Sequence, residues 1–287
     1  MYQFTPIRKT LVWGTESWVL SAVPGSESVV AHGPDAGKKI TDIFPGQFPL
    51  LIKFIDAKRD LSIQVHPDDA LAMARHGCSG KTEMWYVIGA APGAKLISGL
   101  RERITPSDYV RLVAEDRITD VLAEHSVSPG DVFYLPAGRI HAIGGGCYLA
   151  EIQQTSDITY RIYDYNRPGL DGKPRQLHTQ EAKDAIDYKV YPEYRTLYEP
   201  RQNEPVELVR CPYFTTTLYD LTSSSFAGSS GESPFLIAIG LSGSGTIKTA
   251  QDEAALHAGE AVLIPASEGP VSFEPGPDGL RLLTTHP

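Results

Sequence analysis

The sequence predicts an all-β fold that contains two related barrel modules and a small helical segment. Composition supports this prediction, because the 287 residues include 26 glycines and 22 prolines, a content typical of many short strands joined by turns. A repeated pattern supports it as well. A tight Gly–acid turn, an apolar strand and a Pro–Ala step occur at residues 128–137 and again at residues 257–266.

The strands of the first half are predicted from short apolar runs bounded by Gly, Pro or polar residues. Each run is too short to form a stable helix. The predicted strands cover residues 49–55, 61–66, 84–88, 129–136 and 147–152.

Two segments of the first half have helical features instead. Residues 67–75 begin with Pro67 and carry acids in the first turn, which predicts one short helix. Between residues 105 and 125, apolar residues recur at helical spacing with charges between them. This pattern predicts two short helices that break near Asp116.

Two domains and a connector are therefore expected. The first domain covers residues 1–165, and a Pro- and charge-rich connector covers residues 166–205. The second domain covers residues 206–287, where residues 234–240 repeat the apolar pattern of the strand at 84–88.

Charge and cysteine content exclude some classes of protein. The net charge of −9 argues against a general nucleic-acid-binding protein, since affinity for phosphate backbones depends on clustered Lys and Arg. The cysteines, Cys78, Cys147 and Cys211, do not form a disulfide framework or a zinc motif. The sequence shows no signal-peptide pattern and no apolar run of about 18 residues, so we expect a cytoplasmic protein without a membrane span. The sequence does not determine the oligomeric state.

Four residues of the first domain suit a divalent metal. Gln64 and His66 stand two positions apart on one predicted strand, so both side chains point to the same face. Glu83 begins the next clear strand, and His141 follows a Pro–Ala–Gly turn. Two imidazoles, one carboxylate and one amide oxygen form a suitable set of ligands for a metal such as zinc.

The segments around these residues carry a family resemblance. They are residues 61–69 (LSIQVHPDD), 80–86 (GKTEMWY), 136–143 (PAGRIHAI) and 151–161 (EIQQTSDITYR), with a weaker match at 13–18 (WGTESW). Together they resemble type I phosphomannose isomerase, or mannose-6-phosphate isomerase, of the cupin superfamily. The length resembles the short bacterial form of that family. The resemblance implies two cupin-like jelly-roll barrels.

The resemblance also implies roles for individual residues. His66, Glu83 and His141 would bind one zinc ion per chain, with Gln64 as a fourth ligand. Arg161 matches the catalytic arginine of the family, and Lys81 matches a lysine that lines the substrate pocket. Arg167 falls where the family has a basic residue near the phosphate, and Ser62 corresponds to a small polar pocket residue.

The implied activity is the zinc-dependent interconversion of mannose 6-phosphate and fructose 6-phosphate through an enediol. That reaction needs positive charge beside developing oxyanions and a group that moves a proton between C1 and C2. Arg161 and Lys81 suit the first need, and Lys81 is one candidate for the second. The sequence does not fix the identity of the general base.

The second domain is expected to be free of metal and non-catalytic. When the two repeats are aligned on their Pro–Ala steps, Pro270 stands at the position of His141, and Ser233 stands at the position of Glu83. Neither residue offers a zinc ligand of the usual kind.

Two other functions remain open from the residues alone. Two histidines and a carboxylate also form the iron site of cupin dioxygenases, although such enzymes do not generally need the basic set Lys81, Arg161 and Arg167. The other alternative is a non-catalytic sugar-binding cupin module. Sensors of that kind usually carry a pair of DNA-reading helices, which the second half does not offer.

Overall fold

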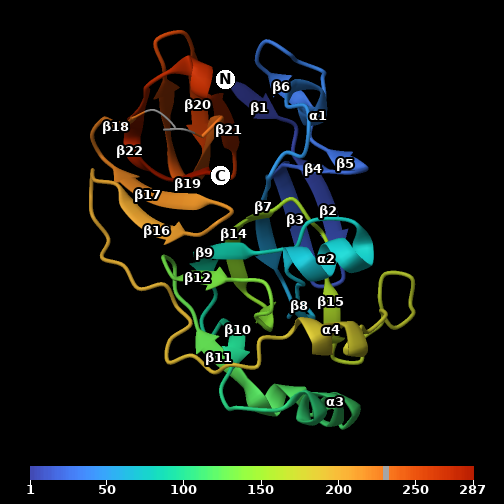
Figure 1. Ribbon diagram of the computed structural model, residues 1–287. Helices are drawn as coiled ribbons and strands as arrows, with labels where there is room; N and C mark the ends of the chain where they lie inside the picture. The colour runs from blue at the N-terminus through green and yellow to red at the C-terminus, as the bar shows by residue number, and fades with distance from the viewer. Residues whose placement is uncertain (229–232) are drawn as a thin grey trace. The chain divides into compact units, whose positions relative to one another are not determined.

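The computed structural model describes residues 1–228 and 233–287, and antiparallel strands dominate it (Figure 1). The prediction of an all-β fold with a small helical segment is confirmed. The contacts divide the chain into two compact units. The site unit comprises Arg8–Ser17 and Leu51–Thr196, and the C-terminal unit comprises Met1–Ile7, Trp18–Leu50 and Leu197–Pro287.

This division differs from the predicted linear boundaries. The segment Trp18–Leu50 belongs to the C-terminal unit, although it was expected in the first domain. Most of the predicted connector, up to Thr196, belongs to the site unit. Local sequence patterns identify strands but not which of two sheets a strand joins, and this explains the difference.

Two sheets build the site unit. One contains, in order, β12 (Val132–Leu135), β9 (Glu83–Ala90), β14 (Cys147–Gln154), β7 (Leu50–Ala57), β3 (Gly14–Leu20) and β2 (Ile7–Leu11). The other contains β11 (Leu122–Ser126), β10 (Lys95–Leu100), β13 (His141–Ile143), β8 (Ile63–Val65) and β15 (Tyr160–Tyr163). The strand pairs β10–β11, β10–β13, β13–β8 and β15–β8 of the five-stranded sheet, and β12–β9 and β14–β9 of the six-stranded sheet, are all antiparallel.

One apolar core joins the two sheets of the site unit. Trp85, Phe133 and Leu149 from the six-stranded sheet share it with Leu96 and Ile143 from the five-stranded sheet. Because side chains alternate along a strand, the residues between these core positions point to the opposite faces of the sheets. The arrangement is the interior of a two-sheet barrel.

A second core lies on the outer face of the five-stranded sheet. Here Ile63, Val65 and Ala142 pack with residues of α3 (Pro106–Ala114), η1 (Ile118–Val121) and α4 (Thr179–Ala185). The predicted break near Asp116 is confirmed, since Asp116 has a φ of 56° between α3 and η1.

The structure corrects two expectations for this region. The helical prediction was wrong for residues 122–125, which form the edge strand β11 beside β10. No helix or strand was predicted in the connector, but it contains α4, whose Ala182 is fully buried in the outer core. Only a short apolar stripe anchors α4, so its sequence lacks a long periodic signal.

The remaining helix of the site unit follows the strand that carries His66. The helix α2 (Asp69–His76) starts two residues later than predicted. The carboxylate of Asp68 accepts a hydrogen bond from the backbone N–H of Leu71, and Gly77 ends the helix in the left-handed conformation.

The C-terminal unit centres on one large antiparallel sheet. Its main path is β16 (Val206–Arg210), β17 (Thr215–Leu221), β22 (Val271–His286), β19 (Phe235–Lys248), β21 (Ala261–Pro265), β1 (Tyr2–Phe4) and β6 (Val30–His32). The strands β18 (Ser225–Gly228) and β20 (Glu253–His257) pair with β22 and β19. The smaller elements are β4 (Ala22–Val23), β5 (Ser26–Glu27), α1 (Ile40–Ile43) and η2 (Ala266–Glu268).

The long strands β19 and β22 bend together, with register shifts near Gly240 and Gly243. At Gly243, with φ +70°, a Cβ atom would lie 2.1 Å from the carbonyl oxygen of Gly279, so only glycine fits the bend. The bend encloses an apolar core that includes Leu236, Phe273 and Leu282. Among the described residues, no helix is long and apolar enough to cross a membrane.

Candidate metal centre and active site

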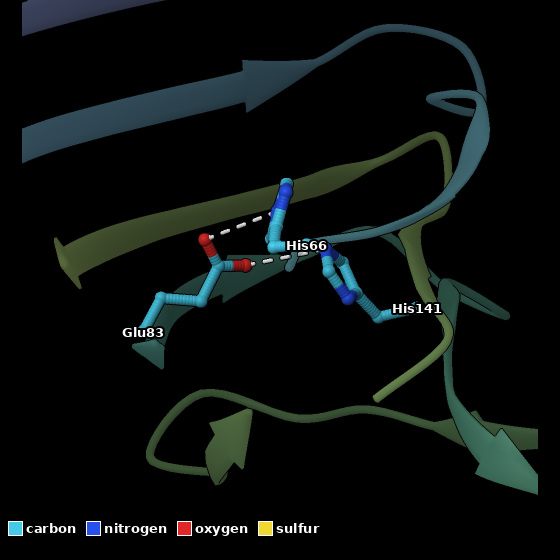
Figure 2. A group of neighbouring side chains, drawn as sticks. All are labelled: His66, Glu83 and His141. Carbon is cyan, nitrogen blue, oxygen red and sulfur yellow. Dashed lines mark ion pairs between the residues drawn. The ribbon is translucent and has the colours of Figure 1, made fainter. Parts of the chain in front are cut away.

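Three of the predicted metal ligands meet in the interior of the site unit. His66 directly follows β8, His141 is the first residue of β13, and Glu83 is the first residue of β9 in the other sheet. All three side chains are buried, and one possible ligand atom of each lies within 4.8 Å of the others. Figure 2 shows the carboxylate of Glu83 facing both imidazoles. The cluster therefore joins the two sheets.

The carboxylate faces one nitrogen of each ring. The Nε2 atom of His141 lies 3.3 Å from Oε1 of Glu83, and the Nε2 atom of His66 lies 3.6 Å from Oε2 (Figure 2). The centroids of the two imidazole rings are 4.7 Å apart. Three atoms with lone pairs thus converge on one small volume.

Backbone carbonyls fix the orientation of both rings. Nδ1 of His66 lies 2.8 Å from the carbonyl oxygen of Ile158, and Nδ1 of His141 lies 2.8 Å from that of Arg139. A carbonyl only accepts, so each Nδ1 carries the proton and each Nε2 keeps its lone pair. This arrangement is typical of histidines that bind metals through Nε2.

The turn before His141 connects the two histidines through the backbone. Gly138 has a φ of +90°, and its N–H donates a 2.9 Å hydrogen bond to the carbonyl oxygen of His66. A side chain at Gly138 would be strained by this φ and would also meet the carbonyl oxygen of Ala185 at 3.0 Å. The glycine of the PAGRIHAI segment is therefore needed for the geometry of both ligands.

Burial controls the charge of the three side chains. Burial, Lys81 and His141 lower the pKa of His66 well below its ordinary value, and burial lowers the pKa of His141 to about 3. Both rings are therefore neutral near pH 7, as a metal ligand must be. Burial and the nearby carboxylate of Glu151 raise the pKa of Glu83, so an isolated negative charge is unfavourable there.

The unsatisfied atoms of the cluster fit a divalent cation. Oε1 of Glu83 and Nε2 of His141 are buried and have no hydrogen-bond partner among the described residues, while Oε2 of Glu83 faces the ammonium group of Lys81. Orphaned buried acceptors of this kind are rare and need an explanation. Two neutral imidazoles and one carboxylate, all presenting lone pairs to the same point, match the ligands of zinc.

Lys81 lies directly beside this cluster. Its ammonium nitrogen is 2.9 Å from Oε2 of Glu83 and 3.0 Å from Nε2 of His66, and the side chain is buried. The structure thus brings Lys81 together with two of the predicted ligands. An ammonium group in this position supplies positive charge at the edge of the candidate metal site.

The predicted residues Gln64 and Arg161 share a row with His141. Gln64 pairs with His141 on one side and with Arg161 on the other. Cross-strand partners of an antiparallel pair project to the same face, so these three side chains lie on the barrel face of the sheet. Ile63 and Val65, which flank Gln64, are in the outer core instead, as alternation requires. Ser62 is buried immediately before β8.

A buried ion pair behind the cluster was not predicted. Nζ of Lys53 on β7 lies 2.9 Å from Oε1 of Glu151 on β14, and the indole N–H of Trp85 donates to Oε2 of Glu151 at 2.8 Å. Burial alone would raise the pKa of Glu151, but Lys53 and Lys81 hold it below its usual range. The sequence did carry a signal, because a charged residue inside the dense apolar run 50–57 must find a buried partner.

A second group of charges lies around Asp164, just after β15. The guanidinium of Arg167 and that of Arg175 both donate to the carboxylate of Asp164, with Nη2 at 2.8 and 2.6 Å from Oδ1. Burial is the largest cause that lowers the pKa of Arg161, and the positive charges of Arg175 and Arg167 lower it further. The structure therefore brings Arg161 and Arg167 into one basic group. It adds Arg175, which sequence reasoning missed because none of the motifs that carry the resemblance includes it.

Comparisons with known proteins agree over nearly the whole chain. Residues 15–84 match the family described as "Phosphomannose isomerase type I, catalytic domain", and residues 205–277 match "Mannose-6-phosphate isomerase, cupin domain". The first match contains His66, Lys81 and Glu83, and the second confirms the expected cupin module in the second half.

Two curated relatives and one solved structure extend these matches. Mannose-6-phosphate isomerase ManA of Bacillus subtilis (strain 168) is 32% identical, covering 94% of this chain and 95% of that protein. The mannose-6-phosphate isomerase of Streptococcus mutans is 34% identical, covering 87% of this chain and 82% of that protein. The crystal structure of mannose 6-phosphate isomerase from Bacillus subtilis superposes with a TM-score of 0.90 at 30% identity, covering 100% of this chain and 99% of that one.

Proposed function

The chain belongs to the type I phosphomannose isomerase family, and we propose that it interconverts mannose 6-phosphate and fructose 6-phosphate at a zinc ion bound by His66, Glu83 and His141. Membership of the family carries the activity and the substrate. One observation supports the position of the site: buried ligand atoms of His66, Glu83 and His141 lie within 4.8 Å of one another, and Oε1 of Glu83 and Nε2 of His141 have no hydrogen-bond partner among the described residues. Gln64 is proposed as the fourth ligand, because its side chain shares the barrel face with His141.

The reaction sets the electrostatic requirements of the site. A proton moves between C1 and C2 of the sugar through an enediol, and negative charge develops on the two neighbouring oxygens. A zinc ion, when bound, acts as a Lewis acid that polarises the sugar carbonyl. Arg161 is proposed to place its guanidinium against the developing charge, because it lies on the barrel face two strands from His141.

Lys81 is proposed to take part in the proton transfer or to stabilise the oxyanion. Its ammonium nitrogen lies 2.9 Å from Oε2 of Glu83 and 3.0 Å from Nε2 of His66, so it would lie beside a sugar oxygen that enters this site. Ser62 and Arg167 are proposed to bind the substrate, and Arg175 joins Arg167 in this role. The shared pairing of both arginines with Asp164 holds their guanidinium groups side by side, as a phosphate dianion requires.

The proposal is tested by incubating the protein with mannose 6-phosphate and measuring fructose 6-phosphate. Treatment with a chelator should abolish the activity, and Zn²⁺ should restore it. His141→Ala should lose both the bound metal and the activity. His286→Ala is a matched control, because His286 lies in the C-terminal unit and should change neither. Full activity in a demonstrably metal-free preparation would contradict the proposal.

We also propose that the enzyme is cytoplasmic. All three cysteines are free thiols in the structure, which agrees with a reducing compartment. The proposed substrate is a phosphorylated sugar, and such metabolites are used inside the cell.

A further inference from the structure

His178 occupies an unusual position for a histidine. It is the residue that precedes the first turn of α4, with φ −122° and ψ 50°, and its side chain makes no capping hydrogen bond to the helix. Residues at this position usually use a side-chain acceptor to cap the helix, and losing that contact costs stability. The imidazole of His178 therefore serves something other than α4.

That other partner is the backbone of Arg161. The N–H of Arg161 donates a 3.1 Å hydrogen bond to Nδ1 of His178, and the N–H of His178 donates a 2.7 Å bond to the carbonyl oxygen of Arg161. The two residues are thus joined by two hydrogen bonds, which satisfy the backbone N–H and C=O of Arg161 and the backbone N–H of His178. The guanidinium is held from the same segment, since Nη1 of Arg161 donates to the carbonyl oxygen of Gln176 at 2.9 Å.

The position of β15 explains why Arg161 needs such contacts. β15 is the terminal strand on its side of the five-stranded sheet, and α4 packs beside it (Figure 1). Both backbone groups of Arg161 bond to His178, so they point away from β8. The pair between Arg161 and Gln64 is then of the type without mutual hydrogen bonds, in which opposing side chains approach most closely. His178 therefore holds the outer edge of β15 at the position where Arg161 pairs with Gln64.

The protonation state of the ring agrees with this geometry. Nδ1 accepts a hydrogen bond, so the proton of the neutral ring is on Nε2. Burial and the positive charge of Arg161 lower the pKa of His178, which favours this neutral form. The ring of Tyr160, the residue before Arg161, also lies beside that of His178, with centroids 6.2 Å apart.

From these contacts we infer that His178 is a positioning residue for Arg161. By bonding the backbone of Arg161, His178 keeps the guanidinium of Arg161 on the barrel face. The inference rests on the proposed function, since it assumes that Arg161 acts on the substrate. His178 itself is not placed against substrate or metal. His178 lies in the connector and influences Arg161 through its hydrogen bonds to β15.

The test compares three substitutions of His178 in the metal-loaded enzyme. His178→Asn keeps an acceptor on Cγ, where Nδ1 is attached, whereas the acceptor of His178→Gln lies one bond further away. Loss of one such hydrogen bond should lower kcat about 5- to 10-fold in His178→Ala and His178→Gln, with KM within about twofold. His178→Asn should return kcat to within about twofold of the parent enzyme. Leu177→Ala is the control, because Leu177 is in the same segment with an exposed side chain.

Different results would overturn the inference in distinct ways. Parent-like kcat in His178→Gln, or equal losses in His178→Asn and His178→Gln, would show that the acceptor does not position Arg161. A purely structural role would lower thermal stability without separating Asn from Gln in kcat. In an Arg161→Ala background, His178→Gln should cost nothing further if it acts through the arginine. Parent-like kcat in Arg161→Ala alone would instead refute the proposed role of Arg161 in the reaction.

Discussion

Replacing Lys53 with methionine should destabilise the site unit strongly. The side chains of Lys53 and Glu151 are only 6% and 4% exposed, and their charged atoms lie 2.9 Å apart. Methionine has a similar length but no charge, so the carboxylate of Glu151 would stay buried and lose the ammonium group, keeping the indole N–H of Trp85 as its hydrogen-bond donor. Removing one partner of a buried ion pair typically costs about 3–5 kcal/mol.

The cost is measured by urea denaturation of the metal-free protein, followed by the fluorescence of the buried Trp85 and Trp13. Lys58→Met is the control, because Lys58 pairs with Asp56 at the surface with 71% of its side chain exposed. An exposed pair of this kind contributes about 0–1 kcal/mol. The double variant Lys53→Met/Glu151→Gln removes both charges and should recover much of the loss. A loss in Lys53→Met no larger than in Lys58→Met would refute the reasoning.

The other predictions concern the reaction, the metal and pH. Arg161→Ala should lower kcat by about 10²-fold, and a change confined to KM would make it only a substrate contact. Elemental analysis of the purified protein should find one tightly bound metal per chain, whereas two would contradict the metal-free second half. Burial lowers the pKa of His141 to about 3, so between about pH 3 and 6.5 the folded metal-free chain binds fewer protons than the unfolded chain. The free energy of unfolding therefore falls as the pH falls through this range. Between pH 7 and pH 5, the free energy of unfolding from urea denaturation should fall by about 2 kcal/mol less in His141→Gln than in the parent protein. An equal fall in both proteins would contradict the lowered pKa of His141.

Local patterns were enough to predict the candidate ligands. Alternation along one strand placed Gln64 and His66 on one face, and the turn before His141 is short enough to identify from its Pro, Gly and His. These signals depend on neighbours within a few positions. The strands β7, β9 and β14 were predicted for the same reason, since each is a compact apolar run.

The missing parts of the site depend on contacts between distant residues. Lys53 and Glu151 are 98 positions apart, and their pairing follows from β7 and β14 being neighbours in one sheet. Arg175 and His178 lie in the connector, where no helix or strand was predicted from the sequence. Their roles depend on how the chain returns to β15 after its turn, and no local periodicity encodes that path.

The charges in the interior of the site unit explain why a lysine stands behind the ligands. Glu83 and Glu151 contribute two negative charges when ionised, and Lys53 and Lys81 balance them, while the histidines are neutral. A divalent cation held by this set would therefore leave an excess of two positive charges. The enediolate carries negative charge on the reacting sugar oxygens, which are uncharged in the bound substrate, so this excess favours the enediolate over the substrate. Loss of Lys53 would halve the excess, so Lys53→Met should lower kcat even when the metal site is fully loaded.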